Sequence, residues 1–339
     1  MKILVNDNNN NTLTIPSKFN KKKLPSNLFD KIDQINQINQ IDKKKNLKIL
    51  NFNKKFNQPL SDSLNELVNL KILIFSRHFN QPLSKSLNLL TNLEELQFGI
   101  YFNKPLLNSL GNLTNLKILI FGDKFNQSLS NSLIKQTQLK ILTFGNNFNK
   151  PLLNSLDQLV NLEELTFCQF FDQPLDNSFI KLTQLKKLKF GYMFNQPLLK
   201  SLDNLINLVI LIFQHNFNQP LSNSLNNLIN LQELHLGNNF NQELIMQNNI
   251  KILNLNCNCL NLIENLPNSI EELNFGYNFD LELNNLPNSI KIIKFIENSK
   301  YDKELNNLPK KIEKLSLSRY YKKEIKNISP NCEIYKCTF

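Results

Sequence analysis

The hydrophobic residues of this chain recur with a fixed period. A phenylalanine followed by Asn, or once by Asp, appears every 23 residues, at Phe56, Phe79, Phe102, Phe125, Phe148, Phe171, Phe194, Phe217 and Phe240. A repeat of about 20–50 residues is the sequence signature of a solenoid, because one unit cannot bury its apolar face alone and must stack on its neighbours. The period therefore predicts stacked coils with one continuous core.

Two hydrophobic periodicities alternate within each unit, whose 23 positions we number from Leu70. Apolar positions 4 and 6 alternate with positions 3 and 5, which is the period of a β-strand. Apolar positions 14, 18 and 21 have the spacing of one or two helical turns. Between them most units carry a proline, such as Pro82, which cannot donate to a strand ladder. The pattern predicts a repeat solenoid with a parallel β-sheet on its concave side and short helical, 3₁₀ or irregular segments on its convex side.

The phenylalanines at positions 6 and 10 are expected to form two stacked aromatic columns inside the coils. The asparagine at position 11 predicts a ladder of hydrogen bonds, because an inward turn leaves backbone groups that need partners and an amide has both donors and an acceptor. The alternative is that Asn is simply favoured in surface turns. Asp172 lacks the amide donors, so the ladder is expected to be weaker there.

The repeat pattern changes toward both ends and divides the chain into three segments. Residues 1–46 match it only in part and contain an insertion, so they are interpreted as a degenerate N-terminal capping coil. Residues 47–248 hold the regular 23-residue units. Residues 249–339 hold shorter coils of 20–22 residues and a C-terminal cap, marked by Leu-Pro-Asn-Ser-Ile at residues 266–270 and 286–290. Terminal repeats are expected to be atypical.

Composition excludes some function classes without selecting one. The chain has 339 residues, a formal net charge of +11, 60 asparagines, no alanine and 7 glycines. The absence of alanine argues against helical repeats, and the few glycines argue against phosphate-binding loops. Because Asn, Lys and Ile have A/T-rich codons, a base-biased genome explains the positive charge as readily as nucleic-acid or membrane binding does.

The 5 cysteines, an odd number, fit a reducing compartment, so we expect an intracellular protein. Cys332 and Cys337 are close enough in sequence to pair or to hold a metal, but no histidine lies near them. The longest apolar run, Leu208 to Phe213, is far below the roughly 20 residues of a membrane-spanning helix, and no signal segment follows Met1. We expect no cofactor, no metal and no membrane partner.

Candidate catalytic residues are few. The chain has 3 histidines, and His235 lies two residues after Glu233, so both side chains point outward from one strand. This pair could serve acid–base chemistry, but scattered polar residues are also ordinary on a repeat surface. No nucleophile, phosphate loop or metal set accompanies it. The sequence therefore predicts that the protein is not an enzyme.

The outward positions of the strands form the strongest candidate surface. Positions 3, 5 and 7 are expected to point away from the core, and solenoids use such sheets to bind partners. Position 7 is often glycine, which leaves room for close approach. Exposed apolar patches usually mark interaction sites, although isoleucine also favours strands in its own right. The candidate partner-binding residues are Ile72, Ile74, Ile118, Ile120, Ile210, Ile212, Lys187 and Lys189, with Tyr101 and Tyr192 along one rim.

The string Phe-Asn-Gln-Pro-Leu recurs at residues 56–60, 79–83, 194–198 and 217–221, each time after a Leu-x-x-Leu-x-Phe pattern, which is followed by glycine at Gly191. Together with the Leu-Pro-Asn-Ser-Ile variants, these strings resemble the FNIP repeat family over residues 47–320. The resemblance implies a leucine-rich-repeat-like fold and protein binding rather than catalysis. The family is found chiefly in social amoebae and in giant DNA viruses of amoebae, so a viral member is expected in the host cytoplasm.

Two alternative functions stay open. Some FNIP relatives carry an F-box and are thought to be substrate adaptors of ubiquitin ligases. Residues 24–28 resemble the opening of an F-box, but the stretch before the repeats lacks its length, so the chain would be the substrate-recognition part of an adaptor without its own F-box. A basic nucleic-acid-binding solenoid is the other alternative, carried by Lys21–Lys23, Lys43–Lys45 and scattered lysines. The favoured prediction is a non-enzymatic protein–protein interaction scaffold that binds partners on the concave sheet, with nucleic acid not expected.

Overall fold

The computed structural model describes residues 12–15, 46–52, 55–221 and 223–336. The chain divides into an N-terminal unit of residues 1–184 and a C-terminal unit of residues 185–339. Of the expected capping coil, only residues 12–15 and Asn46 are described. The lysine clusters Lys21–Lys23 and Lys43–Lys45, the F-box-like residues 24–28 and Cys337 lie outside the described residues.

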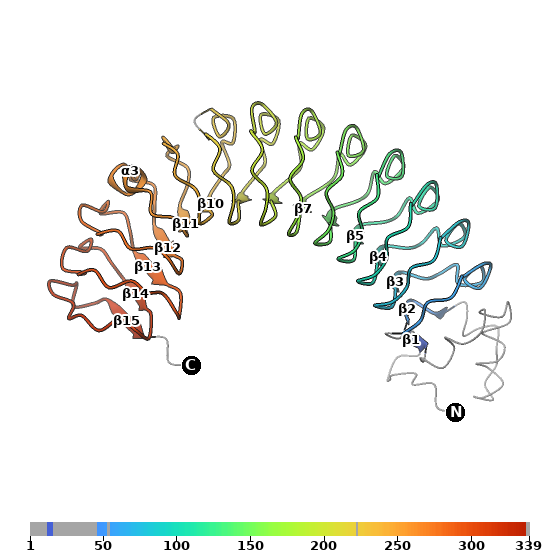
Figure 1. Cartoon of the computed structure of the whole chain (residues 1–339), viewed down its shortest axis with the longest axis horizontal. Coiled ribbons are helices and arrows are strands. Elements are labelled where there is room, and N and C mark those ends of the chain that lie inside the picture. Colours follow the sequence, from blue (N-terminus) through green and yellow to red (C-terminus); the bar gives the residue numbers. More distant parts are fainter. Residues whose placement is uncertain (1–11, 16–45, 53–54, 222, 337–339) are drawn as a thin grey trace. The chain divides into compact units, whose positions relative to one another are not determined.

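Each described coil of the N-terminal unit contributes one short strand, and consecutive strands pair in parallel (Figure 1). The register aligns equal positions of successive coils, as in Leu73 opposite Leu96, and these leucines are fully buried. The flanking positions 3 and 5 are half-buried, which is the alternation that the sequence predicts. The strands are β1 (Thr12–Ile15), β2 (Ile49–Phe52), β3 (Ile72–Ile74), β4 (Glu95–Gln97), β5 (Ile118–Ile120), β6 (Ile141–Thr143) and β7 (Glu164–Thr166).

The C-terminal unit repeats this arrangement, again with parallel pairing in chain order. In each unit the strands lie on the inner side of the coils and the turns fan apart on the outer side, so the sheet is concave (Figure 1). No helix in the described part of the chain has the length and hydrophobicity needed to cross a bilayer. The elements are β8 (Lys187–Lys189), β9 (Ile210–Ile212), β10 (Glu233–Leu236), β11 (Ile252–Leu255), α3 (Leu260–Glu264), β12 (Glu272–Phe275), β13 (Ile292–Phe295), β14 (Lys314–Leu317) and β15 (Glu333–Lys336).

The convex side of the regular coils consists of successive tight turns. The N–H of Ser86 donates to the carbonyl of Leu83 at 2.9 Å, and the N–H of Leu90 donates to that of Leu87 at 3.0 Å. Bonds between residues three apart are those of β-turns and 3₁₀ segments, not of α-helix. The spacing of four and then three residues between positions 14, 18 and 21 therefore identifies the buried leucines correctly. The backbone between them, however, forms turns that are tighter than an α-helical turn.

Position 15 adopts a left-handed backbone, which the sequence did not indicate. Its φ lies between 43° and 49° in every coil from Ser61 to Leu199. For residues other than glycine this conformation costs roughly 1–2 kcal/mol. Ser, Leu and Asp all occur at this position. The left-handed conformation is therefore imposed by the stacking of the coils and not by the type of residue. The residues are Ser61, Ser84, Leu107, Ser130, Leu153, Asp176 and Leu199.

Two columns of phenylalanine fill the interior, as predicted. At position 6, Phe121 and Phe144 have ring centroids 5.6 Å apart, and at position 10 Phe125 and Phe148 are 6.1 Å apart. Within one coil, Phe144 and Phe148 are 4.0 Å apart, with ring planes 13° from parallel. These are offset-stacked contacts, each favourable beyond the apolar area that it buries. Each coil thus supplies the surface that its neighbours' rings require.

The columns are interrupted in one part of the C-terminal unit. Position 6 is leucine in two successive coils, Leu236 and Leu255, and Cys259 stands where the second phenylalanine of the Leu255 coil is expected. Helix α3 begins at the next residue, Leu260, and buries Leu262 and Ile263. The helix therefore adds apolar volume to the coil in which the phenylalanine is missing.

The asparagine ladder at position 11 is confirmed, but its chemistry differs from the expectation. The backbone N–H of Asn126 donates to Oδ1 of Asn103, that of Asn149 to Oδ1 of Asn126, and that of Asp172 to Oδ1 of Asn149, each at 3.0 Å. The ladder thus uses the side-chain oxygen as an acceptor. A carboxylate has that oxygen too, so the expected weakness at Asp172 does not follow: the amide donors that Asp lacks are not the groups that link these coils.

A second ladder at position 23 was missed. The Nδ2 group of Asn92 donates to the carbonyl of Val68 at 3.0 Å, and that of Asn115 donates to the carbonyl of Thr91 at 2.9 Å. Here the amide acts as donor to the turn of the preceding coil. The two ladders give a part of the asparagine content a structural role, beside any codon bias.

Position 7 is not part of the open face, which corrects the sequence-based expectation. A Cβ atom on Gly122 would lie 1.8 Å from the carbonyl oxygen of Gly99, and one on Gly145 would lie 2.0 Å from that of Gly122. Ser76, at the same position, is only 2% exposed. The glycines therefore leave room for the backbone of the preceding coil and not for a partner.

The aromatic columns generate a first prediction. Replacing the fully buried Phe144 by Ala is expected to lower the free energy of unfolding by about 3–5 kcal/mol, since it removes ring contacts and leaves a cavity. Urea denaturation followed by circular dichroism measures this. Phe170→Ala is the matched control, because Phe170 is 40% exposed in the same unit. Equal losses for the two variants would contradict the stacked core.

The position-11 ladder generates a second prediction. Asn126→Ala is expected to cost about 1–2 kcal/mol, because the N–H of Asn149 loses its acceptor. Asn126→Asp is expected to cost much less, because it keeps the acceptor oxygen. Amide hydrogen exchange at Asn149 measures the bond directly. Faster exchange in the Asp variant than in the Ala variant would show that the donors matter after all.

Candidate partner-binding surface

The predicted isoleucines of the N-terminal unit surround a polar strand. Ile72 and Ile74 lie on β3, and Ile118 and Ile120 lie on β5. Between them, the register places Glu95 opposite both Ile72 and Ile118, and Gln97 opposite both Ile74 and Ile120. All six side chains are half-buried. Since neighbouring strands are about 4.8 Å apart, the six residues form one compact surface, which we call the isoleucine–Glu95 face.

The isoleucine–Glu95 face continues to the next strand. Ile141 and Thr143 on β6 lie opposite Ile118 and Ile120. On the other side, Ile49 and Asn51 on β2 lie opposite Ile72 and Ile74, so one further isoleucine extends the apolar surface on each side of Glu95.

Two adjacent glutamates, Glu94 and Glu95, differ in the charge of their partners. Glu94 pairs with Lys117 at 2.7 Å and with Lys71 at 2.5 Å, and the hydrogen bonds from these lysines lower the pKa of its carboxyl group to about 2. Glu95 accepts a hydrogen bond from Gln97, and within the described residues no cation pairs with its carboxylate. The negative charge of Glu95 is thus uncompensated on a surface of isoleucines.

The predicted residues of the C-terminal unit form a separate surface. Lys187 and Lys189 on β8 lie opposite Ile210 and Ile212 on β9. These in turn lie opposite Glu233 and His235 on β10. The outward side chains are therefore basic on β8, apolar on β9, and a glutamate and a histidine on β10. All six are half-buried.

Glu233 and His235 are paired, as their spacing suggested. The Nε2 atom of His235 lies 2.6 Å from a carboxylate oxygen of Glu233 and 3.2 Å from Nδ2 of Asn254. Within the part of the chain that the structure describes, no group of three or more His, Cys, Asp or Glu side chains is arranged to hold a metal ion. On this face of the sheet, the imidazole of His235 is thus hydrogen-bonded between the carboxylate of Glu233 and the side-chain amide of Asn254.

The two rim tyrosines each stack on a histidine, which the sequence did not predict. Tyr101 lies 5.0 Å from His78, centroid to centroid, and the guanidinium of Arg77 lies 5.9 Å from the tyrosine ring. Tyr192 stacks on His215 at 4.4 Å. The stacking fixes the tyrosine rings at the edge of each sheet while leaving them 40% and 39% exposed.

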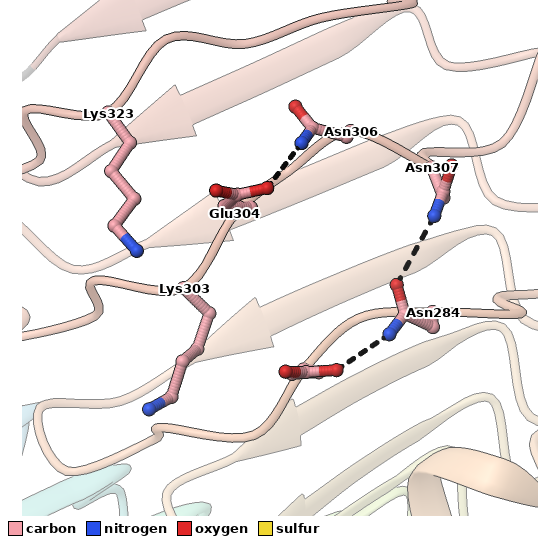
Figure 2. Close-up of a pocket in the computed structure, with 7 residues that line it drawn as sticks. Asn284, Lys303, Glu304, Asn306, Asn307 and Lys323 are labelled. Carbon is pink, nitrogen blue, oxygen red and sulfur yellow. Dashed lines mark hydrogen bonds between the residues drawn. The ribbon is translucent and has the colours of Figure 1, made fainter.

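Two further surfaces were missed. On the turn side, Leu107 and Leu153 are 73% and 67% exposed, more than any of the predicted isoleucines. The available signal was the Leu-Leu pair in these units, whose second leucine falls outside the apolar period. In the C-terminal unit there is a polar cavity of about 300 Å³. Its asparagines hydrogen-bond to glutamates of the same coil, and two lysines flank them (Figure 2). It is lined by Glu282, Asn284, Lys303, Glu304, Asn306, Asn307 and Lys323.

Comparison with solved structures identifies the fold. The crystal structure of CroV588, a circular leucine-rich-repeat protein from a virus, is 30% identical with a TM-score of 0.64 over 81% of this chain, which spans 41% of that protein. An internalin of Listeria monocytogenes is 18% identical with a TM-score of 0.60, over 95% of this chain and 97% of its own. A chain of the Drosophila Toll–Spatzle complex is 15% identical with a TM-score of 0.58, over 88% and 46%. No curated protein sequence matches the chain.

Comparison with protein families gives one match, to the FNIP repeat, at residues 260–298 and 277–320. These residues include the short coils in which Leu-Pro-Asn-Ser-Ile recurs. The family match and the neighbouring structures agree with the resemblance drawn from the sequence. Residues 260–320 thus carry FNIP repeats, and the chain folds as a leucine-rich-repeat-like solenoid.

Proposed function

We propose that the chain is a non-enzymatic scaffold that binds a protein partner on the concave sheet of its N-terminal unit. The observation that carries the proposal is the isoleucine–Glu95 face, where four half-buried isoleucines enclose a charge without a cation. Such a surface is unfavourably hydrated, and a partner that covers it gains apolar burial.

The rigidity of the sheet supports this role. Each strand is fixed by its parallel neighbours and by the phenylalanine columns beneath it, so the outward side chains are held in place before a partner arrives. A preorganised surface loses little conformational freedom on binding, which favours affinity. The fold class agrees, since one structural neighbour was solved within a protein complex, that of Toll and Spatzle.

The C-terminal unit offers a second, independent face for the same kind of function. Its lysines Lys187 and Lys189 beside Ile210 and Ile212 fit a partner segment that combines acidic and apolar residues. Tyr192 extends that face at the rim, as Tyr101 does in the N-terminal unit.

The cysteines support a structural role inside the cell. Among the described residues, none of the cysteines forms a disulfide bond. Burial raises the pKa of Cys257 to about 12, so this thiol stays protonated at neutral pH and is not a nucleophile. Free buried thiols fit a reducing compartment, which agrees with an intracellular location.

The proposal predicts that Ile72→Asp combined with Ile120→Asp abolishes partner binding without unfolding the chain. Two carboxylates on this face add uncompensated charge where a partner would bury apolar surface, while both side chains lie outside the phenylalanine core. Affinity purification from host-cell extract with quantitative mass spectrometry measures the captured proteins, and circular dichroism reports the fold.

The matched control is Ile134→Asp combined with Ile180→Asp. These isoleucines are 53% and 45% exposed in the same unit, on the turn side. The control is expected to capture the same proteins as the wild type. If the concave variant also does so, the concave sheet of this unit is not the binding site.

A further inference from the structure

We propose that the isoleucine–Glu95 face binds an arginine of the partner, flanked on both sides by aliphatic residues of one amphipathic helix. This inference rests on the proposed function and specifies the chemistry of its partner. The arginine would lie over Glu95 and Gln97 on β4, and the aliphatic residues would cover the isoleucines of β3 and β5.

The first argument is the missing cation. At the same strand position of the C-terminal unit, Glu272 pairs with the ammonium group of Lys294 at 2.6 Å, and Glu233 is hydrogen-bonded to the imidazole of His235. Glu95 has the same kind of position but, in the described part of the chain, no basic neighbour of this kind. A carboxylate between apolar side chains is poorly solvated, so a cation delivered by a partner gains more there than on an open surface.

The second argument is the geometry of the acceptors. The amide of Gln97 donates its N–H to Glu95, which leaves the amide oxygen of Gln97 and the second carboxylate oxygen of Glu95 without a donor among the described residues. Both residues point outward from the same strand, two positions apart. A guanidinium group presents several N–H donors in one plane and bridges two neighbouring acceptors, whereas a lysine ammonium is a point charge. The site therefore selects arginine over lysine.

The third argument is the spacing across the strands. Neighbouring strands lie about 4.8 Å apart, and one turn of α-helix rises about 5.4 Å. A helix lying across the strands thus places one residue of its lower face over each strand, with a mismatch of roughly 0.6 Å per strand. Residues at i, i+4 and i+7 would then be aliphatic over β3, arginine over β4 and aliphatic over β5.

The test uses a synthetic helix-stabilised peptide with leucine, arginine and leucine at i, i+4 and i+7, and fluorescence anisotropy against the full chain. Replacing the arginine by citrulline, which keeps the shape but removes the charge, is expected to weaken binding about tenfold or more. Glu95→Gln is expected to weaken binding of the arginine peptide by a similar factor. Combining both changes is expected to add little, because each removes the same interaction.

Two controls make the test specific. Glu94→Gln removes the adjacent carboxylate, whose cations are Lys71 and Lys117, and should leave peptide affinity within twofold of wild type. Glu95→Arg should reverse the preference, so that a peptide with glutamate in place of arginine binds more tightly than the arginine peptide. Circular dichroism of each variant verifies the fold.

The outcomes separate this inference from the proposed function. If Ile72→Asp abolishes peptide binding while Glu95→Gln and citrulline change nothing, the apolar face binds partners but the arginine assignment is wrong. If the wild-type chain does not bind the arginine peptide at millimolar concentration, the assignment is also wrong, and the capture experiment with the isoleucine variants still decides the proposed function. A further peptide, with lysine in place of arginine, is expected to bind more weakly than the arginine peptide, and equal binding of the two would overturn the selection of arginine.

Discussion

The stacking of equal positions from coil to coil is the constraint on which the rest of the structure depends. One coil is too small to enclose its own phenylalanine and leucine side chains. Each ring is covered only because the coils on either side place similar rings against it, as Phe121 and Phe167 do for Phe144. The same requirement fixes the hydrogen bonding, since a backbone N–H that turns inward finds its acceptor on the preceding coil at Asn103 or Asn126. Apolar burial and polar satisfaction are therefore achieved between coils, and neither is available to an isolated unit.

This constraint explains why so much of the fold could be predicted from the sequence. A fixed period with apolar positions at strand and turn spacing specifies which side chains stack, and the observed register of Leu73 with Leu96 follows directly. The features that were missed depend on backbone geometry that residue types do not encode. Leu107 and Leu153 have a positive φ without being glycine or asparagine, and the glycines of position 7 contact the preceding backbone, a proximity that exists only after the coils have closed.

The 23-residue period also made the position of the candidate site predictable, but not the pairing of its charges. The strand period identifies Ile72 and Ile118 as outward residues, and the 23-residue spacing puts Glu95 between them. What the sequence did not show is which carboxylate pairs with a cation: among the described residues Glu95 pairs with none, whereas Glu94, one residue earlier, pairs with Lys71 and Lys117. That difference arises because position 2 lies at the edge of the strand, where lysines of adjacent coils can reach, whereas the neighbours of Glu95 at position 3 are isoleucines.

The outward strand positions are the part of each coil that stacking leaves free. Positions 4, 6 and 10 must stay apolar because every coil buries them against two others, and position 11 must keep an oxygen acceptor for the next coil. Positions 3 and 5 contact only their lateral neighbours, so a change there alters the surface without loss of core packing. A solenoid of this kind can therefore vary its outward sheet face strand by strand. The departure of β4 from the isoleucines around it, with glutamate and glutamine in their place, is the variation on which the proposed preference for arginine rests.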